Sequence, residues 1–454
     1  MEQTFNKKSK IKQLVIILFP ILITQVAMFL MSFFDTVMSG HYSSDDLAGV
    51  AIGSSLWVPV YTGLSGILLS ITPIVAQAIG GKRHKEVSFS VVQGMYLSII
   101  MAIIVFAAGA ASLNAILNEM NLDGNVHTIA HDYLAALGFG IIPLFLYNVV
   151  RSFIDALGKT QVSMFITLLS LPINIVFNYL LIYGKMGFPE LGGVGAGYAT
   201  TITYWLIMAI SFYIVHKHIP FSEFRIFRRL YAVSLLKWKE ILLIGVPIGF
   251  SIFFETSIFS AVTLFMAGFS TATIAAHQAA INFASLLYMV PLSISMALTI
   301  VIGFEVGAKR FDDARQYAFI GIAIAIFMSF ISGIFLSIFR DEVASIYTKD
   351  PAVVQLTAQF LIYAIFFQLS DAIQAPVQGA LRGYKDVNVT FLMTLISYWI
   401  IGLPFGYYLA NYTGWGAFGY WAGLIAGLAV GAICLLTRLV IIQRRYSIDT
   451  KGAR

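Results

Sequence analysis

The chain has 454 residues, of which 59% are hydrophobic and only 11% are charged. A soluble domain carries about 25% charged residues, so this chain cannot cover its surface with polar groups and is expected to face lipid. The net charge of +6 does not indicate nucleic-acid binding, because the basic residues follow the pattern that sets membrane topology.

Apolar segments of membrane-spanning length follow one another along the chain. A transmembrane helix needs about 17–25 apolar residues. The first segment exceeds the 7–15 residues or so of a signal-peptide core, so we expect it to be retained as a helix. The sequence predicts twelve transmembrane helices, near residues 12–39, 48–79, 88–110, 127–155, 160–184, 192–216, 240–268, 274–305, 314–337, 352–381, 387–411 and 416–443. The expected fold class is therefore an all-α polytopic membrane protein.

Lysine and arginine residues lie mainly on one side of these predicted helices. That side carries the N-terminus, KRHK at 82–85, the basic stretch 217–239, AKR at 308–310 and the C-terminus. The other side carries only Lys185, Arg340 and Lys349. Because cytoplasmic loops are enriched in Lys and Arg, both termini are expected in the cytoplasm.

The two halves of the sequence resemble each other. TPIVAQAIGGKR (72–83) aligns with TIVIGFEVGAKR (299–310), and LFPI (18–21) aligns with GVPI (245–248). Such internal similarity indicates repeated structural units.

The repeat divides the chain into a six-helix N-terminal lobe at 1–220, a basic cytoplasmic linker at 221–239 and a six-helix C-terminal lobe at 240–454. Each lobe has an even number of helices, so both enter the membrane in the same orientation. We expect two six-helix bundles related by a pseudo-two-fold axis along the membrane normal, an arrangement of alternating-access transporters.

Three carboxylates fall inside predicted helices without a nearby residue of opposite charge. They are Asp35, Glu255 and Asp371. A charge at the centre of a bilayer costs about 2.5–3.5 kcal/mol, so each is a candidate functional residue. The alternative for each is a protonated carboxyl that only bonds a neighbouring helix.

Three other acids have a local explanation. Asp155 lies four residues after Arg151, and Glu305 lies four residues before Lys309, so each can form an ion pair on one helix face. Asp132 lies near the start of its helix and is expected to reach the outer interface.

Asp35 is expected to share its depth in the membrane with three polar side chains. Counted from the outer helix ends, Asn178 and Thr200 lie near its level, and Asn174 lies one turn below Asn178 on the same face. A carboxylate with amide and hydroxyl oxygens is a candidate site for Na⁺ or a proton. The two asparagines can alternatively serve as interhelical contacts.

The C-terminal half places Glu255 near mid-membrane, Tyr288 at a similar depth and Asp371 somewhat closer to the cytoplasm. Two carboxylates beside an aromatic ring can hold an organic cation, and either acid can alternatively carry a proton or bind Na⁺.

Two further positions in the eighth predicted helix are secondary candidates. Gln278 and Asn282 are spaced to share one helix face. His277, next to Gln278, is expected at the membrane interface and is not expected to have a catalytic role.

Two prolines occupy matching points of the first helix of each half. Pro20 and Pro247 each remove a backbone hydrogen bond and can bend the helix that carries Asp35 or Glu255. Ion binding or protonation is therefore expected to couple to helix bending, and a static kink is the alternative.

Over nearly its whole length, the sequence resembles the MATE (multidrug and toxic compound extrusion) transporters, and most closely their NorM-like branch. The segments that carry the resemblance are FPILITQVAMFLMSFFDTVMSG (19–40), LPINIVFNYLLIYG (171–184), IGVPIGFSIFFE (244–255), ATIAAHQ (272–278) and LSDAIQAPVQGALRGYKD (369–386). The resemblance implies a V-shaped pair of bundles in a bacterial plasma membrane. It also implies export of organic cations against a Na⁺ or H⁺ gradient, without another cofactor and as a monomer.

The resemblance also assigns site residues. The cation-site pattern of the N-terminal lobe matches Asp35, Asn174, Asn178 and Thr200, and that of the C-terminal lobe matches Glu255, Tyr288 and Asp371. Phe367 stands where some members carry tyrosine, so this chain lacks a coordinating hydroxyl at that position.

The main alternative is a lipid-linked oligosaccharide flippase of the same superfamily. Its anionic cargo requires basic cavity residues, and Arg151 is the one candidate in the helices. A membrane enzyme is disfavoured because the sequence contains no zinc-protease, Walker A or nucleophile-elbow motif.

Overall fold

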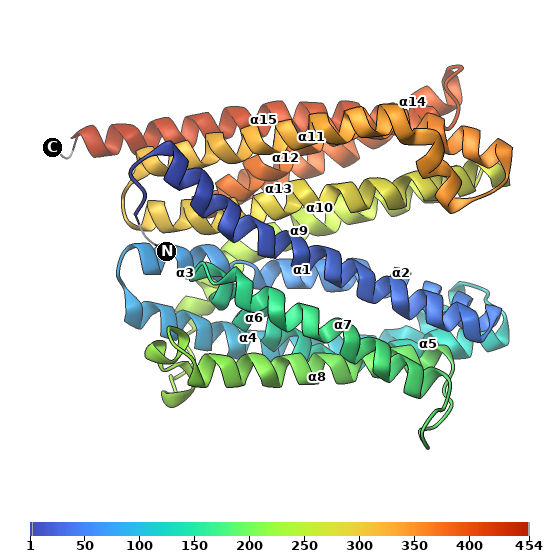
Figure 1. The fold of residues 1–454 in the computed structure, drawn as a ribbon, viewed down its shortest axis with the longest axis horizontal. Helices are drawn as coiled ribbons and strands as arrows, with labels where there is room; N and C mark the ends of the chain where they lie inside the picture. The colour runs from blue at the N-terminus through green and yellow to red at the C-terminus, as the bar shows by residue number, and fades with distance from the viewer. Residues whose placement is uncertain (2, 453–454) are drawn as a thin grey trace. The chain divides into compact units, whose positions relative to one another are not determined.

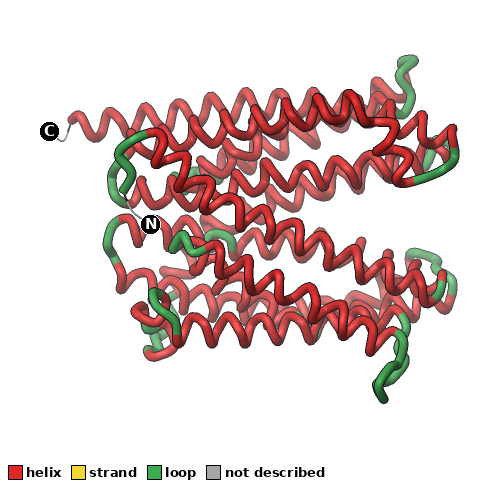
Figure 2. Tube along the Cα trace, viewed as in Figure 1, coloured by secondary structure: helices red, strands yellow, loops and turns green. Residues whose placement is uncertain are grey.

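The computed structural model describes residue 1 and residues 3–452, and helices connected by short loops make up almost all of it (Figures 1 and 2). The first half contains α1 (Lys7–Tyr42), α2 (Ser44–Leu68), α3 (Ile71–Gly80), α4 (His84–Glu119), α5 (Gly124–Gly138), α6 (Ile141–Ala156), α7 (Thr160–Ile182), α8 (Gly193–Lys217) and the short η1 (Phe221–Phe224) and η2 (Ile226–Arg228). The second half contains α9 (Leu235–Met266), α10 (Thr271–Gly307), α11 (Phe311–Tyr347), α12 (Pro351–Gly383), α13 (Asn388–Leu395), η3 (Ile396–Gly402), α14 (Leu403–Tyr412) and α15 (Phe418–Gly452).

The described residues contain eleven segments that are long and apolar enough to cross a membrane. A twelfth is obtained when α5 and α6, which meet at a bend of 49°, are taken as one span. The predicted all-α membrane fold is therefore confirmed, and its eleven to twelve candidate spans agree with the twelve predicted helices.

Three of the spans are irregular in ways that the apolar pattern did not predict. The second is interrupted between α2 and α3, the fourth bends between α5 and α6, and the eleventh contains the π-helix η3. At the bend, a Cβ on Gly140 would lie 2.9 Å from the Thr201 hydroxyl, so the glycine permits close approach of α8. Such contacts depend on tertiary packing and leave no trace in hydropathy.

The chain forms two compact units, Ile23–Val246 and a second that joins Met1–Leu22 to Pro247–Arg454. These units do not coincide with the predicted lobes, whose boundaries remain a prediction. The difference arises because Leu14, Ile17 and Ile21 pack into the apolar cluster of the second unit. Helices α1 and α9 therefore each contribute to both units.

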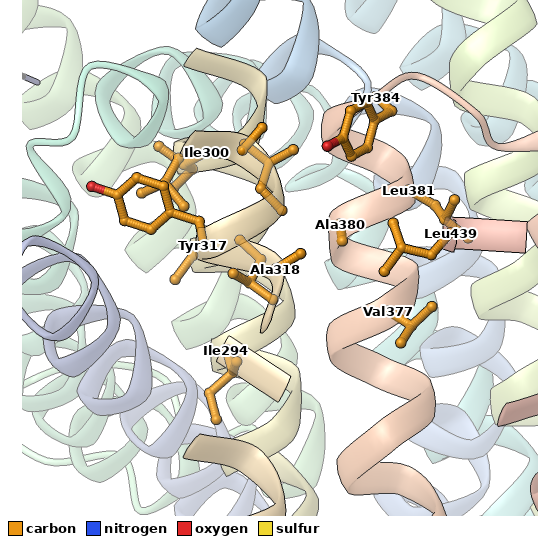
Figure 3. Packing of buried hydrophobic residues seen from close by; sticks show 14 of the residues in the cluster. Ile294, Ile300, Tyr317, Ala318, Val377, Ala380, Leu381, Tyr384 and Leu439 are labelled. Carbon is orange, nitrogen blue, oxygen red and sulfur yellow. The ribbon is translucent and has the colours of Figure 1, made fainter. Parts of the chain in front are cut away.

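One apolar cluster of the second unit is built mainly from α10, α11, α12 and α15. Figure 3 shows Ile294, Tyr317, Val377 and Leu439 among its buried side chains. Helices α10 and α12 approach so closely at Gly379 that a Cβ there would lie 2.1 Å from an α10 carbonyl oxygen. This contact fixes how far α12 is rotated about its own axis.

The segment between α8 and α9, predicted as a linker, belongs to the unit Ile23–Val246 and packs against α4. Gln93 donates to the Ala232 carbonyl oxygen at 2.7 Å and accepts from the Ser234 amide at 2.9 Å. The Ser88 hydroxyl donates to the Phe224 carbonyl oxygen at 2.5 Å. These bonds hold the chain in place where α9 begins.

Candidate functional site

In the unit Ile23–Val246, α1, α7 and α8 bring the four predicted polar residues into one closed ring. Asn178 Nδ2 donates to Asp35 Oδ1 at 2.7 Å and to Asn174 Oδ1 at 3.1 Å. Thr200 Oγ1 donates to Asp35 Oδ2 at 2.8 Å and accepts from Asn174 Nδ2 at 3.1 Å. The ring forms because Asn174 and Asn178 lie one turn apart on α7, facing both neighbouring helices.

This ring leaves one strong acceptor without a donor. Asn178 Oδ1 is buried and has no hydrogen-bond partner, and no described basic residue forms an ion pair with Asp35. Asp35 itself is only 6% exposed. A buried carboxylate beside an unsatisfied amide oxygen offers oxygen ligands to a small cation, or a place for a proton on the carboxylate. The interhelical contacts proposed for the asparagines are part of the same ring.

In the second unit, Glu255 of α9 contacts α12. Gln378 Nε2 donates to Glu255 Oε1 at 2.6 Å and also lies 3.5 Å from the Thr394 hydroxyl. Asp371 and Tyr288 are close enough to Glu255 to interact with it electrostatically. The three residues predicted for this half therefore lie within electrostatic range of one another, and Glu255 is hydrogen-bonded to Gln378 rather than to Asp371 or Tyr288.

The expected relative depth of the two acids is not supported. Glu255 meets α12 at Gln378, which lies seven residues beyond Asp371 toward the end of that helix. Depth counted from helix ends fails here because Glu255 lies 20 residues after the start of α9 whereas Gln378 lies five residues before the end of α12, so these two helix ends are not at one level. Asp371 is thus about 10 Å further from the C-terminal end of α12 than the Glu255 contact, at 1.5 Å per residue.

The surroundings of these acids include residues that the sequence analysis missed. Gln378 bonds directly to Glu255, and Arg382 follows one turn later on α12, buried to 6% exposure. Gln374 lies between Asp371 and Gln378 on the same face, also buried. The sequence did contain a signal for these residues. They lie three, seven and eleven residues after Asp371, and residues at these spacings share one face of a helix.

Phe367 lies one turn before Asp371 on α12 and packs in the interior. Its ring contacts Phe259 and Trp421, with centroids 5.6 and 6.2 Å apart. An apolar ring suits this environment.

The secondary candidates do not join the acidic site. Gln278 and Asn282 are both exposed, and no bond links them. Asn282 instead accepts from the Tyr347 hydroxyl of α11 at 2.9 Å. Among the described residues, nothing connects this pair with Glu255 or Asp371.

The interfacial position expected for His277 is wrong. The side chain is fully buried, with Nδ1 accepting from Trp421 Nε1 at 3.0 Å and Nε2 within 3.1 Å of the Thr263 hydroxyl. An accepting Nδ1 places the proton of the neutral ring on Nε2, which then donates to Thr263. His277 therefore ties three helices together.

Helices α1 and α9 continue through Pro20 and Pro247. The boundaries between the compact units fall after Leu22 and after Val246, so each proline lies beside the point where its helix passes from one unit to the other. Bending at these prolines remains a prediction.

The acids with local explanations behave in two ways. Arg151 Nε lies 3.5 Å from Asp155 Oδ2, as predicted, and Asp132 is about half exposed. The predicted pair of Glu305 with Lys309 is wrong, because Glu305 pairs with Arg310 at 2.5 Å. Helix α10 ends at Gly307 and Lys309 has a positive φ of 59°, so the spacing of an uninterrupted helix does not apply.

Comparison with known families follows the same twofold pattern. The MatE family model matches residues 20–180 and again residues 247–408. The chain belongs to the MATE family. The two matched segments begin at Pro20 and Pro247, in agreement with the alignment of the two halves.

This MATE chain has close relatives over its whole length. The probable multidrug resistance protein NorM of Halalkalibacterium halodurans is 59% identical over 446 residues, covering 98% of this chain and 97% of the relative. The protein of the same name from Bacillus subtilis is 59% identical over 447 residues, covering 98% and 99%.

Solved structures of MATE transporters share its fold. The eukaryotic MATE transporter AtDTX14 superposes with a TM-score of 0.87 at 20% identity, covering 98% of this chain and 99% of that one. An outward-facing MATE multidrug resistance transporter of the MOP superfamily gives 0.88 at 19% identity, with coverages of 98% and 100%. At these identities the similarity establishes the fold of this MATE chain, and its site chemistry rests on its own residues.

Proposed function

We propose that this protein is a secondary active multidrug exporter, which moves organic cations across the membrane in exchange for Na⁺ or H⁺ by alternating access. Relatives that match almost the full chain are named multidrug resistance proteins. The chain is a multi-span membrane protein of a transporter family. Transport driven by an ion gradient needs a cation site within the membrane, and the molecule offers two candidates.

The observation that carries this proposal is that each compact unit holds a buried carboxylate without an ion-pair partner, Asp35 in one and Asp371 in the other, and that the half-buried Glu255 interacts with Asp371. No described basic residue forms an ion pair with Asp35, Glu255 or Asp371, although all three lie inside apolar helices. Burying an unpaired charge is expensive, and binding a cation or proton offsets that expense. A transporter for anions would instead place basic groups at these positions.

The two acidic sites differ in a way that suggests different tasks. The Asp35 ring is compact and made of small oxygen-bearing side chains, which suits a coupling ion. The site of Glu255, Asp371 and Tyr288 includes an aromatic ring, which can also attract an organic cation. We therefore assign coupling to Asp35, Asn174, Asn178 and Thr200, and cation or substrate binding to the second site.

Helix bending at Pro20 and Pro247 would connect ion binding to alternating access. Each proline lies in a helix that also carries a proposed ion-binding acid. Binding of a cation or proton changes the charge within the helix. Because proline lacks one backbone hydrogen bond, the helix bends most easily there.

The same proposal includes the cellular setting. The distribution of basic residues supports a location in a bacterial plasma membrane, with both termini on the cytoplasmic side. The protein acts as a lipid-embedded monomer on cationic, partly apolar drugs, and needs no cofactor other than the coupling ion. The flippase alternative is disfavoured because Arg151, its basic candidate from the sequence, is held by Asp155, and the buried Arg382 lies one turn from the point where Glu255 contacts α12.

Transport into everted membrane vesicles tests the proposal. Accumulation of ethidium should follow an imposed Na⁺ gradient or an imposed pH gradient, and Glu255→Gln and Asp371→Asn should each reduce it strongly. Transport that requires ATP, or that both substitutions leave unchanged, would show that the protein works in another way.

A further inference from the structure

One buried cation lies within reach of the second acidic site and has no assigned role. Arg382 is in the last turn of α12 and is 6% exposed. Its Nε has no hydrogen-bond partner in the described part of the chain, and no described carboxylate lies within ion-pair distance of it. Burying an arginine without a partner carries a desolvation penalty that destabilises the fold, unless its charge interacts with a nearby ionised group.

The polar face of α12 connects Arg382 to the acids. Asp371, Gln374, Gln378 and Arg382 follow at spacings of three, four and four residues, so they form one row along the helix. All four are buried. Figure 3 shows the other face of α12, where Val377, Ala380 and Leu381 join the apolar core.

Glu255 enters this row between the two charges of α12. It accepts from Gln378 at 2.6 Å, and Arg382 lies one turn, about 6 Å, further along the helix. The charge of Arg382 therefore acts on Glu255, and both act on Tyr288. Asp371 lies two turns from Gln378 in the opposite direction.

Close packing prevents the row from turning away. Gly383, like Gly379, lies directly against α10. A Cβ on Gly383 would lie 2.9 Å from the Ile302 side chain, so there is no room for a larger residue. The Thr299 hydroxyl donates to the Gly379 carbonyl oxygen at 2.9 Å. Since both glycines flank Arg382, this contact fixes the direction in which the arginine projects.

We propose that Arg382 is the resident counter-charge of the Glu255 and Asp371 site, and that it limits the net charge of the ionised site to one negative unit. Two carboxylates alone would hold two monovalent cations and release them slowly. With Arg382 present, one cation neutralises the site, so a second cation enters only as the first leaves. This inference rests on the proposed function, because it concerns how the same site exchanges its cations.

The experiment measures equilibrium binding of tetraphenylphosphonium, a permanently charged organic cation, to the purified full-length protein at one pH and salt concentration. Arg382→Gln removes the positive charge and should tighten binding about tenfold. This is the change in affinity expected when a repulsive unit charge about 10 Å from the bound cation is removed, at an effective dielectric constant near 20. Arg382→Lys keeps the charge and should bind like the unaltered protein. Arg444→Gln, at an exposed position of α15, is the matched control and should change nothing.

A second comparison covers the case in which Arg382→Gln does not fold. Glu255→Gln should weaken binding, and the double variant Glu255→Gln/Arg382→Gln should recover it, because one negative charge is restored. Equal binding by the single and double Glu255 variants would overturn the counter-charge role, as would unchanged binding by a folded Arg382→Gln protein.

The same measurements separate this inference from the proposed function. Acid substitutions that weaken binding while arginine substitutions have no effect contradict only the role of Arg382. If the unaltered protein fails to bind the cation, or if Glu255→Gln and Asp371→Asn leave its binding unchanged, both ideas are wrong.

Discussion

The replacement of Asp35 by asparagine addresses the proposed coupling site directly. Asp35→Asn removes one negative charge and changes no heavy-atom position. The new carbonyl oxygen can accept from Asn178 Nδ2, which lies 2.7 Å from the present oxygen. The new amide nitrogen can donate to Thr200 Oγ1, 2.8 Å away. The ring is therefore expected to survive, so that the variant tests charge rather than folding.

The size of the effect follows from the isolation of the carboxylate. Asp35 has no basic partner among the described residues, so its charge is available to a bound cation. Two unit charges about 4 Å apart attract by about 4 kcal/mol at an effective dielectric constant near 20. Because 1.4 kcal/mol corresponds to a factor of ten, loss of this charge should weaken binding of the coupling ion about a thousandfold.

The assay is ethidium accumulation in everted vesicles under separately imposed Na⁺ and pH gradients. Asp35→Asn should abolish accumulation against a gradient at physiological ion concentrations, while the amount of folded protein stays unchanged by size-exclusion chromatography. Asp132→Asn, which neutralises an acid about half exposed in the same unit, is the matched control and should transport normally. If Asp35→Asn retains more than half of the driven transport, the assignment of coupling to Asp35 is refuted.

Three further substitutions test the geometry. Thr200→Val removes the hydroxyl that donates to Asp35 and should raise the half-saturating concentration of the coupling ion about tenfold, whereas Thr200→Ser should not; equal values for both would contradict the ring. Gly379→Ala puts a Cβ 2.1 Å from a carbonyl oxygen and should destabilise the protein by about 1–3 kcal/mol in thermal unfolding, unlike Gly109→Ala, which has open space; equal melting temperatures would show that α10 and α12 pack less closely. His277→Leu breaks two buried bonds and should lower the melting temperature while the ion dependence of transport stays the same; a shifted ion dependence would give His277 a part in coupling.

The sequence by itself determined the class of the protein and the number of its helices. A chain with 11% charged residues cannot form a soluble surface, and the lengths of its apolar segments specify twelve spans. It also identified the three isolated acids, because a charge inside an apolar segment is conspicuous whatever the tertiary structure. Repetition of short segments revealed the two halves, and the family model matches each half separately.

The tertiary structure decided which side chains meet. Asp35 lies 143 residues from Asn178 and 165 from Thr200, and their contact depends on how three helices rotate about their own axes. Apolar residues surround most of these helices, so hydropathy does not specify the rotation. Counting residues from helix ends placed the ring at one level correctly. It failed for Glu255, because the adjoining ends of α9 and α12 are not at one level.

Arg382 shows the same limit most clearly. In the sequence it is one of several basic residues near a cytoplasmic helix end, where arginine ordinarily serves topology. Only the close contact of α10 with α12 at Gly379 and Gly383 fixes its direction and buries it in the row that meets Glu255. The apolar pattern and the charge count follow from composition, whereas the environment of a single charge follows from packing distances that only the folded chain defines.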